Sequence, residues 1–361
     1  MDPVERQPCV LSIRGKHGGY EFKLRGVSES ISSIMEIDSN VISAVKLAKG
    51  FFFLGVPLGA TDKGLLEEIG RMIRERIQRE DILASQLSGQ MRGYGAYIWE
   101  KLFPPEIKFA LGLLPESSFL TLDIDEGIAT LPWELAFDGQ NFLHMKFACG
   151  RMFDVRGRRP QKAADQRILI VANPTGDLPE SLNEANYIIE QLRAITNLRI
   201  SRFGYEITRM KFLELLRTGG FGILHYTGHS QESANEPEKS HLLFRDGPCY
   251  ARDIEKVSSD GMPWLVFANS CLSGYTLRSG VTSLAGSFLR AGTSSYVGAL
   301  WPISDLGSAM LSSDFYRLVL HGMTVGEALR KARVNSFTKW GYHDPVWASF
   351  VLFSDPTAKL V

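Results

Sequence analysis

Residues 223–230 (ILHYTGHS) and 264–274 (WLVFANSCLSG) decide how this chain folds. Each segment is a short apolar run that ends abruptly in small and reactive residues, which is typical of a buried strand in a parallel sheet. In open α/β sheets, ligands and chemistry collect at the carboxyl ends of the strands. One run carries His229 to that edge and the other carries Cys271. If the two strands are neighbours, an imidazole lies beside a thiol, the minimum apparatus of a cysteine nucleophile with a general base.

The chain on both sides of these runs alternates apolar strand patterns with amphipathic helix patterns. Such alternation indicates βαβ units and a parallel sheet with helices on both faces. One helix, from 181 to 194, has a predicted capping box formed by Ser181 and Glu184. The predicted strands are 168–172, 198–203, 221–227, 264–268, 294–300 and 347–353, a small hairpin is predicted around 242–250, and the other predicted helices are 208–218, 251–257, 282–291, 305–320 and 324–336.

The first part of the chain has a different pattern, in which a hairpin precedes several helices. Residues 9–14 and 20–25 alternate apolar and polar around a glycine-rich turn, which predicts the hairpin. The charged stretch 154–167 is the best candidate boundary within the chain, and the core of the second unit, 165–361, begins at its end. We take residues 1–117 as an N-terminal region and residues 118–361 as the whole second unit. The other predicted elements are helices over 30–46, 61–79, 93–102 and 106–114, a strand over 118–125 and a short helix over 131–138.

Bulk composition excludes several classes of function. The 361 residues include 40 basic and 40 acidic side chains, so no net field favours nucleic acid or a membrane surface. The most apolar window, 47–60, holds a Lys, a Pro and three Gly and is too short to span a bilayer. No signal peptide is apparent, and the four scattered cysteines form no C-x-x-C pair. We therefore expect a cytoplasmic protein with no metal and no cofactor.

Small residues surround the candidate nucleophile. The sequence Asn-Ser-Cys-Leu-Ser-Gly at 269–274 leaves room for a peptide backbone to approach the Cys271 sulfur. A lone buried Cys is more often a core residue, and a lone His is more often structural. The same position of Cys271 and His229, each after an apolar strand, favours the catalytic interpretation. His225 lies inside its strand and is interpreted as structural.

Several ordered motifs make the chain resemble the CHAT family, caspase-like cysteine peptidases of the clan that also holds caspases, separase and gingipains. The resemblance covers roughly residues 118–361. It implies a caspase-like three-layer α/β/α sandwich with a mostly parallel sheet, preceded by an N-terminal α+β regulatory region. The motifs are YTGHS at 226–230, NSCLSG at 269–274, GALWPISD at 298–305, LPWEL at 131–135, NPTGDLP at 173–179 and DPVWASFVLFSD at 344–355.

The resemblance also implies the roles of the central residues. Cys271 would be the nucleophile and His229 the general acid and base, with an oxyanion hole made by the backbone N–H groups of Cys271 and Ser230. Many relatives have Gly where this chain has Ser230; a backbone donor tolerates the change, although a positive φ there would be strained. No residue of this chain is assigned to orient His229.

The loops that follow the strands are expected to line the pocket for the P1 residue of a substrate. Candidate substrate-binding residues are Asn173, Asp177, Leu178, Trp301 and Asp305. Asp305 stands where separase-like sequences carry an acid suited to a basic P1 residue, but an N-cap for the next helix is an equally good role for it. Trp301 is equally compatible with a wall of the pocket and with core packing.

The leading interpretation is a cysteine endopeptidase that cleaves a protein substrate through a thioester acyl-enzyme. The resemblance implies a regulated bacterial protease of antiviral defence or programmed cell death, with a gasdermin-like or other effector as substrate, and a regulatory protein partner bound through residues 1–117. The alternative is a non-catalytic interaction or scaffold module on the same fold. A nucleotide-binding domain is disfavoured, because neither G-x-G-x-x-G after residue 172 nor a P-loop motif is present.

Overall fold

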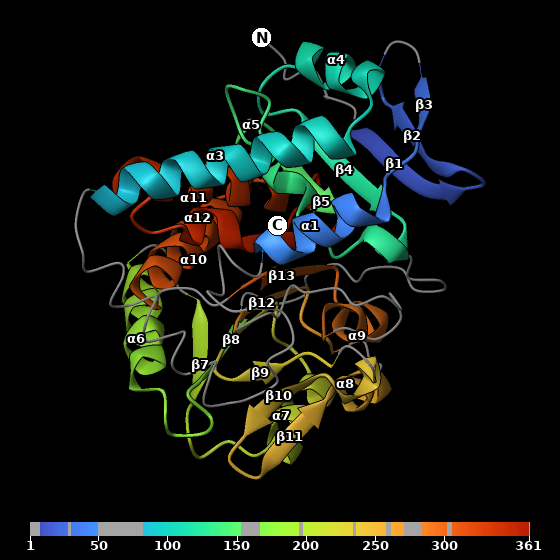
Figure 1. The fold of residues 1–361 in the computed structure, drawn as a ribbon. Helices are drawn as coiled ribbons and strands as arrows, with labels where there is room; N and C mark the ends of the chain where they lie inside the picture. The colour runs from blue at the N-terminus through green and yellow to red at the C-terminus, as the bar shows by residue number, and fades with distance from the viewer. Residues whose placement is uncertain are drawn as a thin grey trace.

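A computed structural model shows a large mixed sheet covered by helices (Figure 1). It describes residues 8–27, 30–49, 82–152, 167–194, 198–233, 236–257, 261–270, 284–301 and 305–360. Within these residues an 11-stranded sheet has the order β3-β2-β1-β4-β5-β14-β13-β12-β8-β6-β7, and β9, β10 and β11 form a separate small sheet.

The strands of the large sheet are β1 (Cys9–Lys16), β2 (Gly19–Arg25), β3 (Ile31–Met35), β4 (Phe119–Ile124), β5 (Ala148–Arg151), β6 (Arg167–Ala172), β7 (Arg199–Phe203), β8 (Ile223–Thr227), β12 (Leu265–Asn269), β13 (Ser295–Ala299) and β14 (Phe350–Phe353). The small sheet has β9 (Ser230–Gln231), β10 (His241–Phe244) and β11 (Gly247–Tyr250). The helices are α1 (Ser39–Lys49), α3 (Ile82–Leu102), α4 (Pro105–Leu113), α5 (Leu143–Lys146), α6 (Pro179–Arg193), α7 (Arg209–Thr218), α8 (Ala251–Val257), α9 (Leu284–Ala291), α10 (Asp305–Leu320), α11 (Val325–Trp340) and α12 (Val346–Ser349).

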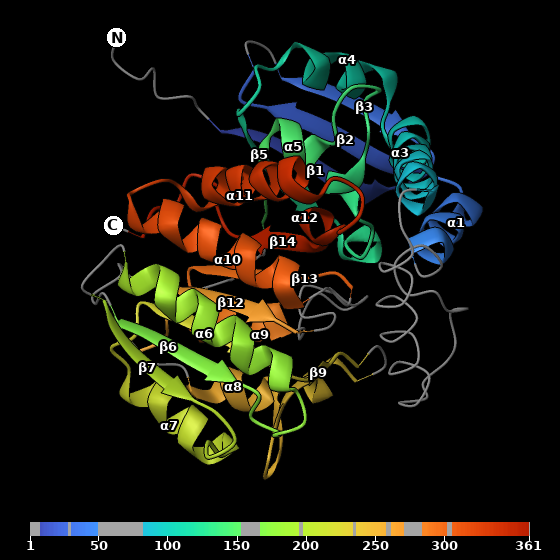
Figure 2. The same ribbon diagram turned by 90° about the vertical axis from the view of Figure 1, so that its left-hand side faces the viewer.

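The second half of the chain is a three-layer α/β/α sandwich, as predicted. In β6, Ile168 and Ile170 pack into one apolar cluster while Leu169 and Val171 pack into another, because successive side chains of a strand point to opposite faces. Buried residues of α6, α10 and α11 belong to the first cluster, and buried residues of α7, α8 and α9 belong to the second. Figure 2 shows α6, α10 and α11 on one side of the sheet and α7 and α8 on the other.

The sheet reverses direction between β13 and β14, which pair antiparallel, whereas β13, β12, β8, β6 and β7 run parallel to one another. On the far side of the reversal, β14, β5, β4 and β1 are again mutually parallel. The carboxyl ends of these four strands therefore lie at the edge of the sheet opposite to the carboxyl ends of β8 and β12. The N-terminal hairpin, β1 with β2, extends the same sheet through β4.

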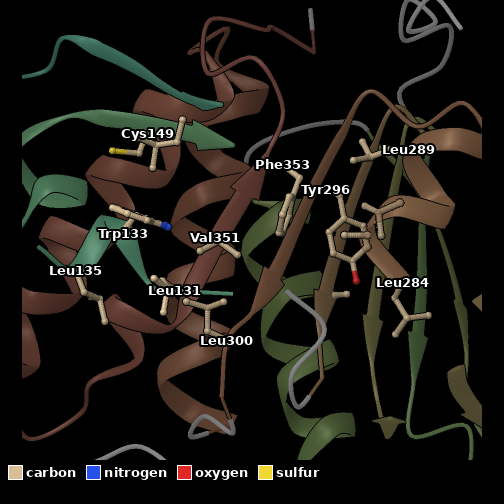
Figure 3. Packing of buried hydrophobic residues seen from close by; sticks show 14 of the residues in the cluster. Leu131, Trp133, Leu135, Cys149, Leu284, Leu289, Tyr296, Leu300, Val351 and Phe353 are labelled. Carbon is tan, nitrogen blue, oxygen red and sulfur yellow. The ribbon is translucent and has the colours of Figure 1, made fainter. Parts of the chain in front are cut away.

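One apolar cluster spans the reversal and joins the N-terminal strands to the rest of the core. Figure 3 shows Trp133 and Cys149 on one side of this cluster and Tyr296 on the other, with Val351 and Phe353 of β14 between them. Trp133 is fully buried, and its indole N–H donates to the Ile128 carbonyl at 3.0 Å. The described residues between 8 and 152 thus contribute to the same core as the residues that follow.

A buried ion pair anchors the LPWEL segment of residues 131–135. Arg151 Nε and Nη2 each lie 2.6 Å from one carboxylate oxygen of Glu134, and both side chains are buried. Arg151 also donates to the carbonyls of Ala129 and Leu131. Burial raises the pKa of Glu134, but the charge and hydrogen bonds of Arg151 outweigh burial and hold that pKa below its usual value.

Two predictions about local structure are wrong. Residues 31–35 form strand β3, an edge strand paired with β2, and helix α1 begins only at Ser39, where the Asp38 carboxylate accepts the N–H of Asn40. The capping box is also wrong, because α6 begins at Pro179 with Leu178 as its N-cap and no side-chain cap. Proline suits the first helical position, and the Glu184 side chain is buried in the protein instead.

Most other predicted elements are confirmed. The first hairpin forms with Gly15 opposite Tyr20, and α7 is capped by Thr208, whose hydroxyl accepts the N–H of Lys211. The predicted helix over 131–138 is a single 3₁₀ turn, Trp133–Leu135. The predicted helix over 61–79 and nearly all of the boundary at 154–167 lie outside the described residues. Among the helices that are described, none combines the length and apolar character needed to cross a bilayer.

Candidate active site

Strands β8 and β12 are hydrogen-bonded neighbours and run parallel. Their last residues, Thr227 and Asn269, lie opposite each other in the register. His229 and Cys271 each follow two residues after those paired ends. The structure describes the Cys-bearing strand as far as Ser270, and Cys271 itself lies outside the described residues. The adjacency of the two strand ends, on which the sequence argument depended, is confirmed.

The backbone of His229 is held from two sides. Its carbonyl accepts the hydroxyl of Tyr226 at 2.7 Å and the N–H of Leu243 at 3.0 Å. Tyr226 is buried, which raises the pKa of its phenol well above the usual value, so the hydroxyl remains a donor. The imidazole is 38% exposed, so a substrate in solution can reach the ring while the backbone below it stays fixed.

Asp177 contacts the imidazole of His229. Its Oδ2 lies 3.1 Å from Nε2. A carboxylate only accepts hydrogen bonds, so Nε2 carries a proton in this contact, and Nδ1 is the ring nitrogen available to gain or lose the other proton. Asp177 was predicted to line the substrate pocket, and no residue was predicted to orient His229. The position of Asp177 after β6, the strand beside β8, is the sequence signal that could have indicated this contact.

The charge state of Asp177 suits this contact. Partial burial raises the pKa of Asp177, but hydrogen bonds from the Thr175 hydroxyl and from His229, together with the charge of His229, outweigh burial and lower that pKa below the usual value. The carboxylate is 61% exposed, so water screens the pair and its contribution to stability is small. The effect of this contact is to keep a proton on Nε2 of the His229 ring.

The loop at 173–178 is closed by Asn173. This residue adopts a left-handed backbone conformation with φ of 52°, which Asn tolerates better than most residues. Its side-chain oxygen accepts the N–H of Leu178 at 2.9 Å, and its own N–H donates to the Thr227 carbonyl. Asn173 is 4% exposed, so its side chain holds the loop in shape. A contact of Asn173 or Leu178 with substrate stays a prediction.

The other predicted site residues are placed as follows. Ser230 begins β9 opposite Leu242, and its φ is not positive, so the strain considered for it does not arise. Trp301 is 2% exposed within the apolar core, as its core-packing interpretation requires. Asp305 is the first residue of α10, but its side chain lies outside the described part of the structure. His225 is fully buried, as expected for a structural histidine.

Glu232 lies three residues after His229 and bridges to the start of α9. Its Oε1 accepts the N–H of Leu284 at 3.3 Å. Part of the side chain is accessible, yet Oε2 is shielded from solvent and has no hydrogen-bond partner within the described residues. Burial raises the pKa of Glu232 to about 8, and the opposing hydrogen bonds from Ser240 and Leu284 do not offset it.

This raised pKa gives a testable dependence of stability on pH. Between the unfolded pKa of 4.5 and the folded value of about 8, the folded state holds a proton that the unfolded state has lost. The free energy of unfolding therefore falls as pH rises through this window, by up to about 1.4 kcal/mol per pH unit from this group. In urea titrations at pH 5, 6.5 and 8, the free energy of unfolding of Glu232→Gln is expected to decrease less with rising pH than that of wild type. If the free energy of unfolding depended on pH equally in the two proteins, the raised pKa of Glu232 would be contradicted.

No metal site emerges from the described residues, where no three His, Cys, Asp or Glu side chains cluster as ligands. The polar groups gathered at the carboxyl ends of β6 and β8 are an imidazole, a carboxylate and backbone amides. This set can accept and return a proton next to a nucleophile.

A three-layer α/β/α sandwich with this imidazole beside the strand that leads into Asn-Ser-Cys is the architecture of the caspase-like cysteine peptidases. The chain belongs to the CHAT domain family, because the family model matches residues 92–355, well over half of its length. The match begins within α3, earlier than residue 118, where the sequence resemblance was expected to start. Comparison with curated proteins gives no match.

Two solved structures, with TM-scores of 0.50 and 0.52, share the fold at low sequence identity. The Arg-specific cysteine proteinase gingipain R is 14% identical, with a TM-score of 0.50 over 75% of this chain and 68% of that chain. A structure described only as a protease is 12% identical, with a TM-score of 0.52 over 75% of this chain and 69% of that one. Saccharomyces cerevisiae separase, in complex with securin, is 16% identical with a TM-score of 0.45, and the match spans 22% of that chain.

Proposed function

We propose that the protein is a cysteine endopeptidase in which His229 and Cys271 act as a dyad. Nδ1 of His229 takes the proton of the Cys271 thiol, and the thiolate attacks the scissile carbonyl carbon. The tetrahedral oxyanion is held by the backbone N–H groups of Ser230 and Cys271. Nδ1 returns the proton to the departing amine, leaving a thioester that water hydrolyses with His229 again acting as base.

The observation that carries this proposal is the register of β8 and β12. Thr227 and Asn269 are paired, so the chain leaves the sheet from adjacent strands at the same edge, two residues before each candidate in the sequence. The contact between Asp177 and His229 Nε2 supports the assignment of Nδ1 as the base. The family and the fold of the solved relatives agree with proteolytic chemistry.

A peptide library tests the proposal directly. Wild-type protein is expected to cleave a subset of peptides after a common P1 residue, and Cys271→Ala is expected to cleave none at equal concentration. A basic P1 preference would support an acidic role for Asp305 in the pocket. Equal cleavage by both proteins, or cleavage by neither, would contradict the proposed dyad.

Alkylation with iodoacetamide tests the nucleophile without any substrate. Cys9, Cys149 and Cys249 are buried, and burial raises the pKa of each of their thiols, which makes them poor background targets. Mass spectrometry is therefore expected to find label on Cys271 first, at a rate above that of a free cysteine at pH 7. Labelling no faster than a free thiol would favour the non-catalytic scaffold alternative.

The family resemblance also supports a proposal for the biological setting. We place the protease in the cytoplasm, in antiviral defence or programmed cell death, with a gasdermin-like or other effector protein as substrate. Bacteria that express the wild type are expected to form fewer phage plaques than bacteria that express Cys271→Ala. Equal plaque numbers at equal protein levels would contradict the defence role.

Residues 1–117 are proposed to restrain the protease or to bind an activating protein. Phe109 and Leu113 of α4 are 69% and 70% exposed, and they lie one helical turn apart. Since β1 pairs with β4, deletion of the region would unpair the sheet, so surface substitutions are the better test. Phe109→Glu with Leu113→Glu is expected to change cleavage of the effector in cells while leaving the activity of the purified protein on peptides unchanged. Equal effects in both assays, or none in either, would contradict this role.

A further inference from the structure

A buried carboxylate joins the ends of the two strands that lead to the candidate dyad. Glu184 of α6 accepts the hydroxyl of Thr227 on Oε2 at 2.7 Å and the side-chain amide of Asn269 on Oε1 at 2.6 Å. Thr227 and Asn269 are the last residues of β8 and β12 and face each other in the sheet. One side chain from a helix therefore bridges two adjacent strands at the point where both end.

The bridge continues below the strand ends. His225 Nε2 lies 3.2 Å from Glu184 Oε1, and His225 Nδ1 lies 2.8 Å from the hydroxyl of Tyr316. Burial, together with the charge of Glu184, raises the pKa of Tyr316 well above its usual value, so its hydroxyl stays protonated. The amide of Asn269 also donates to the Ser308 hydroxyl of α10 at 2.8 Å.

Every member of this cluster is shielded from water. Glu184 is 2% exposed, and the other members are no more than 7% exposed. A buried carboxylate is costly to desolvate, and an apolar core residue of similar size often gives equal or greater stability. Glu184 caps no helix end, since α6 begins five residues earlier at Pro179. The arrangement is therefore better suited to fixing geometry than to adding stability.

The path from the bridge to the imidazole is short and tightly packed. Only Gly228 separates Thr227 from His229. A Cβ atom at Gly228 would lie 2.9 Å from Pro174 Cδ and 2.9 Å from the Tyr226 hydroxyl, so the backbone passes close to both neighbours and leaves no space for a side chain. On the neighbouring strand, Ser270 follows Asn269 and is 4% exposed. A displacement of the paired ends would consequently be passed to both residues of the dyad.

From these contacts we propose that Glu184 is a positioning residue for the dyad. It ties the carboxyl ends of β8 and β12 together and so sets the separation between the imidazole of His229 and the thiol of Cys271. This inference rests on the proposed peptidase function. It assigns Glu184 no contact with substrate, and its effect belongs to the chemical step and not to substrate binding.

The test compares Glu184→Ala and Glu184→Gln with Ile188→Ala. Ile188 is fully buried one turn further along α6, belongs to an apolar cluster and has no polar side-chain group to join the bridge. Glutamine keeps an acceptor for Asn269, and the Thr227 hydroxyl can rotate to accept its amide. Because misplacement by about 1 Å can cost about 100-fold in rate, Glu184→Ala is expected to lower kcat for the best library peptide by about 100-fold with little change in KM. Glu184→Gln should recover most of that loss.

All assays are run below the melting temperature of the least stable variant. Ile188→Ala is expected to melt earlier than wild type but to keep its kcat, as a purely structural residue would. A kcat for Glu184→Ala equal to that of wild type or of Ile188→Ala would overturn the proposal, as would a loss confined to KM.

Alkylation of Cys271 separates this proposal from the peptidase proposal. Glu184→Ala is expected to move the pH profile of labelling toward that of a free thiol, whose pKa is about 8.5, whereas Ile188→Ala keeps the wild-type profile. If wild type cleaves no peptide, the peptidase proposal fails, and the labelling profiles alone then decide the role of Glu184. Identical profiles for Glu184→Ala and wild type would overturn it.

Discussion

Replacement of His229 by glutamine is expected to lower kcat for peptide hydrolysis by roughly 10⁴- to 10⁶-fold. Glutamine is close in size, can still donate toward Asp177, and lacks a group that accepts and returns a proton near neutral pH. The backbone carbonyl of His229 is held by the Tyr226 hydroxyl and the Leu243 N–H, neither of which depends on the ring. Loss of activity with an unchanged fold is therefore the expected outcome.

The matched control is His241→Gln. His241 lies on β10 of the small sheet that begins directly after His229, and its Nδ1 contacts the backbone carbonyl of Lys239. Activity of that variant should stay near the wild-type level, and circular dichroism should be the same for all three proteins. Retention of more than about one hundredth of wild-type kcat in His229→Gln would contradict the role of general base.

Arg151→Leu is expected to destabilise the fold by about 3–5 kcal/mol, since it leaves the Glu134 carboxylate buried without its partner. The two side chains are 4% and 6% exposed, so water cannot replace the lost contacts. The depressed pKa of Glu134 makes the pair's contribution complete above the unfolded pKa, and that contribution is lost as pH falls through the folded pKa. The deficit of Arg151→Leu should consequently shrink in acid.

Urea denaturation at pH 7 and at pH 4 measures both effects. Lys16→Met serves as the control, because it breaks an ion pair whose lysine is 49% exposed and should cost less than about 1 kcal/mol. Adding Glu134→Leu to Arg151→Leu should restore only part of the loss, since the carbonyls of Ala129 and Leu131 stay without their donor. A loss below about 1 kcal/mol for Arg151→Leu would show that the pair is not a stabilising contact.

Periodicity made the second half of the chain predictable. The strands around residues 223–227 and 265–269 are short, mostly apolar and wholly buried, and the long amphipathic helix Asp305–Leu320 was predicted with the ends the structure gives it. The helix predicted over 30–46 was wrong in its first part. Ile31, Ile34 and Met35 fit a helical spacing, but residues 31–35 pair with β2 and extend the sheet by a strand. β9 is two residues long and carries no pattern of its own.

The hydrogen-bond partners of the site residues could not be predicted from the sequence. Glu184 lies three residues after a serine, which fits a capping box in the sequence, and only the position of α6 against the strand ends shows its real partners. Asp177 was found by its place in a strand-end loop, but its contact with His229 depends on how that loop is closed by Asn173. Such pairs lie 43 or more residues apart in the chain, beyond the reach of local pattern.

The reversal of the sheet between β13 and β14 has a pharmacological consequence. The open ends of β1, β4 and β5 face away from the edge where His229 stands. A small molecule lodged at those ends would lie away from the proposed peptide site beside His229. Inhibition by such a molecule would have to act through the fold and not by direct competition with a peptide.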